Sequence, residues 1–125
     1  MLSVDYFASA ILLNDGKGNF SIQELPAEAQ FSPLKCGAVV DANDDHRPDI
    51  LLFGNFYQNN IQLGRNDADF GTLLINKGKG DFYAEALNGL TITGQVRHIH
   101  QVIVKGKINY MLAMNNDSLR AITIK

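Results

Sequence analysis

Short apolar runs separated by Gly, Asn and Asp extend along the whole chain. Apolar runs of this length, bounded by turn-forming residues, are typical of β-strands. No segment sustains the 3.6-residue spacing of an amphipathic helix, and the stretch between Pro26 and Pro33 has room for a single helical turn. The pattern therefore predicts an all-β fold with strands at 8–14, 19–25, 36–41, 49–55, 71–76, 81–87, 95–104, 109–115 and 119–125.

Two stretches of the chain repeat each other. "LLNDGKGNF" ends at Phe20 and "LLINKGKGDF" ends at Phe82, so that Asn14 aligns with Asn76 at an offset of 62 residues. Each copy is an apolar run, a Gly-rich turn and a second run that opens with Phe, which is the pattern of a β-hairpin. Propeller blades repeat at about 40–50 residues, so this period suits antiparallel four-stranded β-propeller-type blades with a long loop each, about two in this chain.

The repeat divides a single β domain, residues 1–125, into three parts. We expect a leading hairpin and connection at 8–35, a four-stranded blade at 36–87 and a trailing partial blade at 95–125. A closed propeller needs at least four blades, so this chain would form only part of one. Either the leading hairpin pairs with the trailing strands, or the open strand edges are covered by a second copy in a homo-oligomer.

The segment "DANDDHRPDILLFGNF" (41–56) carries the strongest candidate chemistry. Calcium takes about six to eight oxygen ligands, and a tight loop with oxygen-bearing side chains at alternate positions supplies several at once. The alternative interpretation is a polar turn held by hydrogen bonds from Asp and Asn side chains to the backbone. The predicted calcium ligands are Asp41, Asn43, Asp45, Asp49 and the backbone carbonyl of Arg47.

This loop is not an EF-hand. An EF-hand requires Gly at the sixth position and Glu at the twelfth, between two helices. Here the sixth and twelfth positions are His46 and Leu52, and both flanks are predicted strands. Asp49, at the ninth position, offers the closing carboxylate instead.

The spacing of these four side chains, the strand "DILLFGNF" that follows and the hairpin "LLINKGKGDF" resemble the FG-GAP/VCBS repeat family. These repeats are the calcium-loop blades of integrin-type β-propellers. The chain from about residue 11 also resembles the C-terminal portion of large secreted bacterial repeat proteins. The family usually has Gly where this chain has His46, and a left-handed backbone there would add strain of about 1 kcal/mol.

A second polar set lies on the long loop after the fourth predicted strand. Polar and aromatic side chains together can stack on a sugar or peptide and form hydrogen bonds with it, and functional residues concentrate on such loops. The alternative is an ordered loop in which Arg65 pairs with a neighbouring carboxylate. The candidate ligand-binding residues are Asn55, Tyr57, Arg65, Asp67 and Asp69.

Composition excludes several partners. The net charge of -2 and the pI near 5.8 lack the basic footprint of a nucleic-acid-binding protein, and no apolar run approaches the length of a membrane span. The start lacks the basic head and apolar stretch of a signal peptide. Export to the cell surface or the extracellular space, which the resemblance implies, would therefore need a leader outside these residues.

These observations predict a protein without catalytic activity. No nucleophile, general base and orienting group follow one another in a known order, and no Gly-rich phosphate loop leads from a strand into a helix. We expect a calcium-supported binding or scaffold module of an exported cell-surface protein, with a protein or glycan partner. The alternative is a carbohydrate-binding accessory domain of a secreted carbohydrate-active enzyme, with the sugar bound at the loop 55–69.

Overall fold

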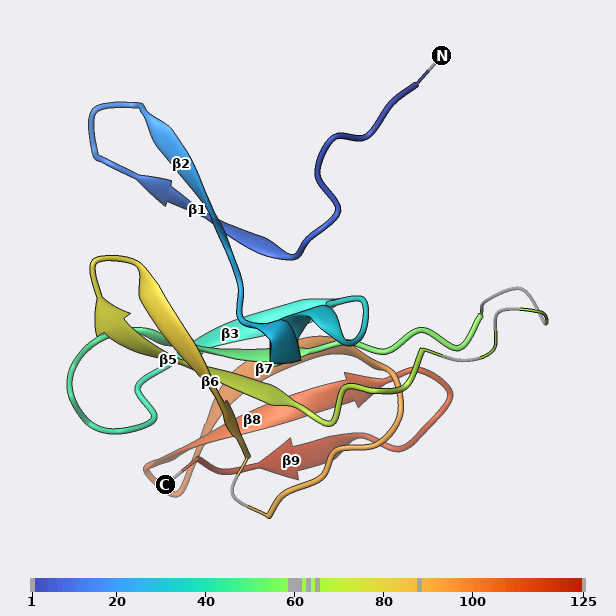
Figure 1. Ribbon diagram of the computed structural model, residues 1–125. Coiled ribbons are helices and arrows are strands. Elements are labelled where there is room, and N and C mark those ends of the chain that lie inside the picture. The colour runs from blue at the N-terminus through green and yellow to red at the C-terminus, as the bar shows by residue number, and fades with distance from the viewer. Residues whose placement is uncertain (1, 59–61, 63, 65, 88, 125) are drawn as a thin grey trace.

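A computed structural model describes residues 2–58, 62, 64, 66–87 and 89–124. Within these residues, no helix has the length and apolar character needed to cross a membrane. The described elements are β1 (Ala10–Asn14), β2 (Phe20–Glu24), the short 3-10 helix η1 (Ala27–Gln30), β3 (Cys36–Val40), β4 (Asp49–Phe53), β5 (Thr72–Gly78), β6 (Asp81–Ala86), β7 (Val96–Val104), β8 (Lys107–Met114) and β9 (Arg120–Ile122) (Figure 1).

The strands form three antiparallel sheets, with the orders β1–β2, β3–β4–β5–β6 and β7–β8–β9. The predicted all-β, antiparallel class is confirmed, and each of the nine predicted strands has a counterpart. The four-stranded sheet falls within the predicted unit 36–87. The strands described here do not close into a ring or barrel, and the assignment of the sheets to propeller blades stays a prediction.

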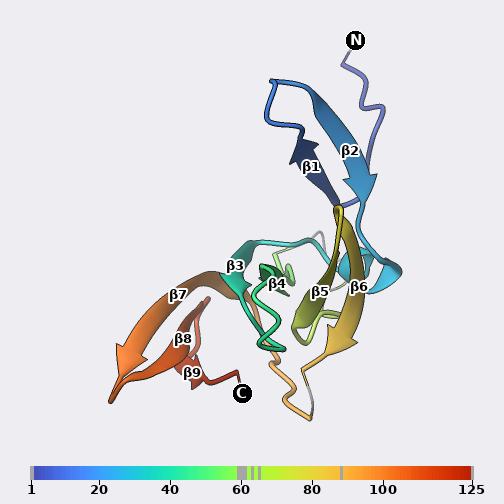
Figure 2. The same cartoon turned by 90° about the vertical axis from the view of Figure 1, so that its left-hand side faces the viewer.

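The leading hairpin forms a sheet of its own. β1 and β2 pair only with each other among the described strands, so the hairpin does not complete the sheet of β7, β8 and β9. Figures 1 and 2 show the hairpin at the N-terminal end of the molecule and the β7–β9 sheet at the other end. The arrangement in which the leading hairpin pairs with the trailing strands is therefore not present in this chain.

Strand β4 is apolar on both faces, as a central strand should be. Leu51 and Phe53 are buried in the main core, together with residues of β5, β7, β8 and β9. The alternate residues Ile50 and Leu52 pack on a second cluster, which contains Leu74. The four-stranded sheet is thus covered on one face by the trailing sheet and on the other by the segment around β1 and η1.

The two hairpins of the repeat have the same register. Asn14 pairs with Phe20 in the first hairpin, and Asn76 pairs with Phe82 in the second. Each Asn side chain accepts a hydrogen bond of 2.8 Å from the amide two residues later. The hairpins also lie against each other, since a Cβ atom added at Gly80 would fall 2.3 Å from Leu13 (Figure 1).

The two phenylalanines nevertheless differ in burial. Phe82 is half-buried against the cluster that contains Leu74, whereas Phe20 is 63% exposed. The difference arises because the β1–β2 hairpin covers β5–β6, while no described segment packs on Phe20. The equivalence that the repeat predicts therefore holds for the register and not for the packing.

This pair of residues provides a test of the packing. We expect Phe82→Ala to lower the free energy of unfolding by about 2 kcal/mol, less than the ~3–5 kcal/mol of a fully buried Phe. Phe20→Ala, the control at the matching register position, should change it by less than about 0.5 kcal/mol. Urea denaturation measures both, and equal losses would show that the two hairpins are covered alike.

Candidate functional site

The loop between β3 and β4 is organised around the side chain of Asp41. Its Oδ1 accepts a hydrogen bond of 3.1 Å from the Asp45 amide, and its Oδ2 accepts one of 3.0 Å from the His46 amide. Asn43 Oδ1 accepts from the same Asp45 amide at 3.2 Å. Side-chain oxygens of two predicted calcium ligands, Asp41 and Asn43, therefore both accept a hydrogen bond from the Asp45 amide.

Asp45 is held by its neighbours in the loop. Its Oδ1 accepts a hydrogen bond of 2.8 Å from the Arg47 amide, and its Oδ2 lies 3.0 Å from Arg47 Nη2. The amide hydrogen bond, helped by the guanidinium of Arg47 and the side chain of Asn43, lowers the pKa of the Asp45 carboxyl. Asp45 is therefore ionised at neutral pH, as a cation ligand must be.

Asp49 closes the base of the loop and is completely buried. Its Oδ2 accepts a hydrogen bond of 3.0 Å from the Ala42 amide, and its Oδ1 accepts one of 2.8 Å from the Asn76 amide of β5. Asn76 Nδ2 donates in turn to the Pro48 carbonyl at 3.0 Å. The first residue of β4 thus connects the start of the loop to the neighbouring strand.

Two residues of the loop have left-handed backbones, Asp44 with φ 57° and His46 with φ 63°. His46 stands where the FG-GAP/VCBS pattern has Gly. Its left-handed backbone therefore carries the strain of about 1 kcal/mol that the sequence predicts for a non-Gly residue at this position. Its imidazole Nδ1 lies 3.4 Å from Asp41 Oδ2.

The donor set of the loop fits a hard cation, because every predicted ligand atom is oxygen. In the described residues, no three His, Cys, Asp or Glu side chains are already grouped as a metal site. The guanidinium of Arg47 lies against Asp45, where a cation would compete with it. Both interpretations of the sequence, a calcium loop and a turn held by side-chain hydrogen bonds, agree with these contacts, and calcium binding stays a prediction.

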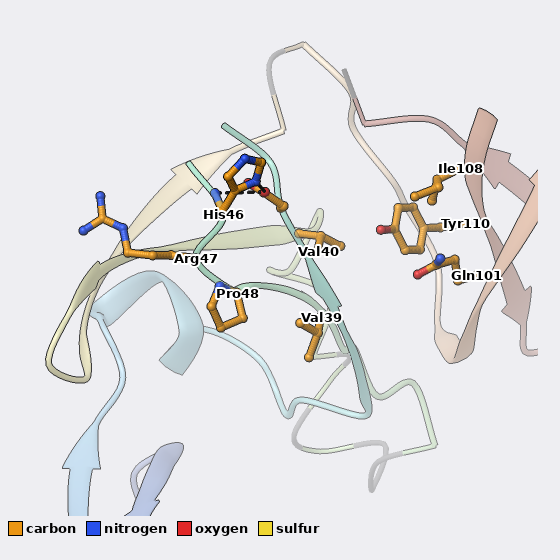
Figure 3. A pocket seen from close by; sticks show the side chains of 9 residues that line it. Val39, Val40, His46, Arg47, Pro48, Gln101, Ile108 and Tyr110 are labelled. Carbon is orange, nitrogen blue, oxygen red and sulfur yellow. Dashed lines mark hydrogen bonds and ion pairs between the residues drawn. The ribbon is translucent and has the colours of Figure 1, made fainter. Parts of the chain in front are cut away.

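A cleft of about 340 Å³ lies between this loop and the trailing sheet. Figure 3 shows Gln101, Ile108 and Tyr110 facing Val39 and Val40 across it. The loop contributes a polar rim of Asp41, His46 and Arg47. The sequence does not indicate this cleft, because its walls come from distant parts of the chain and no local pattern marks Gln101 or Tyr110 as a binding residue.

Asn55, predicted to bind a ligand, lies in the interior with 1% of its surface exposed. Its Nδ2 donates to the carbonyls of Asp69 and Gly94 at 2.7 and 2.9 Å. Its Oδ1 accepts from the Asp69 amide and from Ser32 Oγ, both at 3.0 Å. This side chain therefore joins segments of the backbone and does not face solvent.

Asp69 is its buried partner. The carboxylate accepts hydrogen bonds from the Gly54 amide, from the Gly71 amide at 3.0 Å and from Thr72 Oγ1 at 3.4 Å. Burial raises the pKa of Asp69, and the hydrogen bonds from Gly71, Gly54 and Thr72 oppose that rise. Asp69 thus holds the chain that leaves β4 against the chain that enters β5.

The remaining residues of the predicted ligand set are divided. Asp67 is exposed and Tyr57 is half-buried, whereas Arg65 lies outside the described residues. The backbones of Phe56 and Asn66 form an isolated bridge, with hydrogen bonds of 2.7 and 2.9 Å, at the neck of this loop. The five residues therefore do not form one exposed surface, because Asn55 and Asp69 are buried and form hydrogen bonds with backbone groups in the interior.

The chain matches no protein-family model, no curated protein and no solved structure. The resemblance to FG-GAP/VCBS repeats rests on the motifs alone, and the interpretation of the site rests on its geometry.

The internal role of Asp69 can be tested with a matched pair of variants. Asp69→Asn keeps the shape but turns an amide group toward a backbone or hydroxyl donor, so we expect a loss of about 1–3 kcal/mol in unfolding free energy. Asp67→Asn, two residues away and exposed, should change it by less than about 0.5 kcal/mol. Urea denaturation at pH 7 measures both, and a stable Asp69→Asn would show that this carboxylate does not hold the loop.

Proposed function

We propose that this chain is a non-catalytic binding or scaffold module of an exported cell-surface protein, supported by calcium at the loop 41–49. One observation carries the proposal. Oxygens of Asp41 and Asn43 converge on the Asp45 amide within a loop that the buried Asp49 closes against β5. A cation held there would stabilise the junction between β3, β4 and β5.

The residues that would hold calcium are Asp41, Asn43, Asp45 and Asp49, with the carbonyl of Arg47. Calcium would supply the positive charge that the guanidinium of Arg47 now provides to Asp45. Arg47 also donates to the Lys77 carbonyl at 3.2 Å, so the arginine can keep its contact with β5 when it leaves the carboxylate. The exposed position of Arg47 lowers the cost of that exchange.

The ligand surface that we propose is the cleft beside the loop. Its polar rim belongs to the loop itself, so the conformation that calcium stabilises would also set the shape of this wall. A protein or glycan segment with hydrogen-bonding groups suits the mixture of His46, Gln101 and apolar side chains. In this proposal the four-stranded sheet is one blade of an integrin-type propeller.

A carbohydrate-binding accessory domain is the alternative function. It has less support at the loop 55–69, because Asn55 and Asp69 are committed to backbone contacts in the interior. A glycan array with the full chain and with Tyr57→Ala and Tyr110→Ala separates the two. Sugar binding that Tyr57→Ala abolishes and Tyr110→Ala retains would favour the accessory domain, and the reverse would favour the cleft.

The calcium proposal predicts a stability that depends on the ion. At a calcium concentration 100 times the dissociation constant, linkage adds about 2.7 kcal/mol to the free energy of unfolding. Asp41→Asn should lose most of this gain, because it replaces a ligand carboxylate. Thermal unfolding in calcium and in chelator measures the response.

The control is Asp44→Asn, which removes one charge from the same loop at a position outside the ligand set. Asn tolerates the left-handed backbone at this position, so the calcium response should be retained. An unchanged melting temperature of the wild-type protein between chelator and millimolar calcium would refute the proposal. An equal loss in both variants would indicate general charge screening.

A further inference from the structure

The trailing sheet covers only part of the four-stranded sheet. β7 lies next to β3, and Ile122 of β9 shares the main core with Leu73 and Ile75 of β5. No described strand lies beyond β9 to face β6, which is the outermost strand of its sheet. The two sheets therefore differ by one strand on this side.

A groove of about 580 Å³ lies at this position. Leu73, Tyr83 and Leu87 line one side of it, and Ile122 and Ile124 line the other. β7 and β8 contribute nothing to its lining, which places the groove on the β9 side of the trailing sheet. The lining also includes the polar side chains of Asn43, Glu85 and Thr123, so the groove is mainly apolar and carries one carboxylate. Such a groove beside an open strand edge suits an added strand, which would pair with β9 and turn alternate side chains onto β6.

The segment before β1 has the pattern of such a strand. Leu2, Val4 and Tyr6 alternate with Ser3 and Asp5, so that an extended segment would have one apolar face. In this chain the segment belongs to no sheet, and Leu2, Val4 and Tyr6 are 102%, 62% and 46% exposed. Phe7, 89% exposed, falls on the other face, with Ser3 and Asp5. Six residues extend over about 20 Å, enough to follow β9 and the residues after it.

Residues 2–7 do not reach the groove of their own chain. Figures 1 and 2 both show the N-terminus at the end of the molecule opposite the C-terminus, and the groove is lined by the C-terminal residues Ala121–Ile124. The occupant must therefore come from another molecule. A second copy of this chain carries the segment in a free and extended form.

The area that such an exchange buries suits a stable dimer. In each segment Tyr6 can bury about 150–250 Å², and Leu2, Val4, the paired backbone and the covered groove add to this area. With two segments in two grooves, the total is on the order of 1,500 Å², within the ~1,200–2,000 Å² of stable interfaces. A reciprocal exchange also closes the assembly at two copies.

We propose that residues 2–7 of one chain add to β9 of a second copy as a fourth strand, with Leu2, Val4 and Tyr6 in the groove over β6, in a reciprocal dimer. The inference is independent of calcium and of the cleft beside the loop 41–49. The sequence predicted a homo-oligomer formed through open strand edges, and this proposal names the edge as β9 and the pairing segment as residues 2–7.

Two variants that add the same charge to adjacent residues test the proposal. Val4→Asp places a carboxylate in the apolar groove and should weaken dimerisation at least tenfold. Ser3→Asp places it on the opposite, solvent-facing side of the added strand and should leave dimerisation within about threefold. Both residues are exposed in the single chain, so neither variant should change its fold. Sedimentation equilibrium from 1 to 200 micromolar measures the association of each full-length chain.

A third variant changes the lining of the groove, whereas the first two change the segment that would enter it. Leu90 lines the groove and is 42% exposed, so Leu90→Glu should weaken dimerisation as Val4→Asp does. The proposal is supported when the wild-type chain reaches twice its 13.8 kDa mass and both groove-directed variants remain single chains. A wild-type chain that stays at 13.8 kDa throughout overturns it. So does association that survives Val4→Asp, which would point to another surface, such as the outer face of β1–β2.

Discussion

The fully buried carboxylate of Asp49 is the contact on which both the fold and the candidate site depend. It accepts hydrogen bonds from the amides of Ala42 and Asn76, so it ties the start of the loop to β5. A buried carboxyl group is stable only when hydrogen bonds satisfy it, and the loss of its partners would cost about 1–3 kcal/mol. These two hydrogen bonds therefore fix the position of the loop relative to β5.

Buried polar side chains stand at both ends of the central strand. Asp49 begins β4, and Asn55 follows two residues after its end. Both are satisfied mainly by backbone groups from other segments, and Asp69 completes the second set. Such networks add specificity because their donors and acceptors fit only one arrangement of the chain. The apolar faces of β4 supply burial, and these polar contacts determine which loops meet at its ends.

Exposed apolar surfaces lie at two opposite ends of the molecule. The outer face of the β1–β2 hairpin carries Leu12, Phe20 and Ile22, each about 60% exposed. At the other end of the molecule, the groove beside β9 exposes the uncovered side of β6. Large apolar patches of this kind are uncommon on monomers and are associated with interfaces. A further sheet or a further copy of the chain would bury exposed apolar area at either end.

The sequence by itself determined the strands, their antiparallel class and the register of the two hairpins. Alternation and turn chemistry are local, so the Asn14–Phe20 and Asn76–Phe82 pairs could be aligned before any packing was known. Only the tertiary structure decided which polar residues are buried. Asn55 and Asp69 lie inside because residues from Ser32 to Gly94 surround them, and the cleft at Tyr110 exists because distant strands meet. Burial depends on contacts between segments far apart in the chain, and a local pattern of residue types does not encode those contacts.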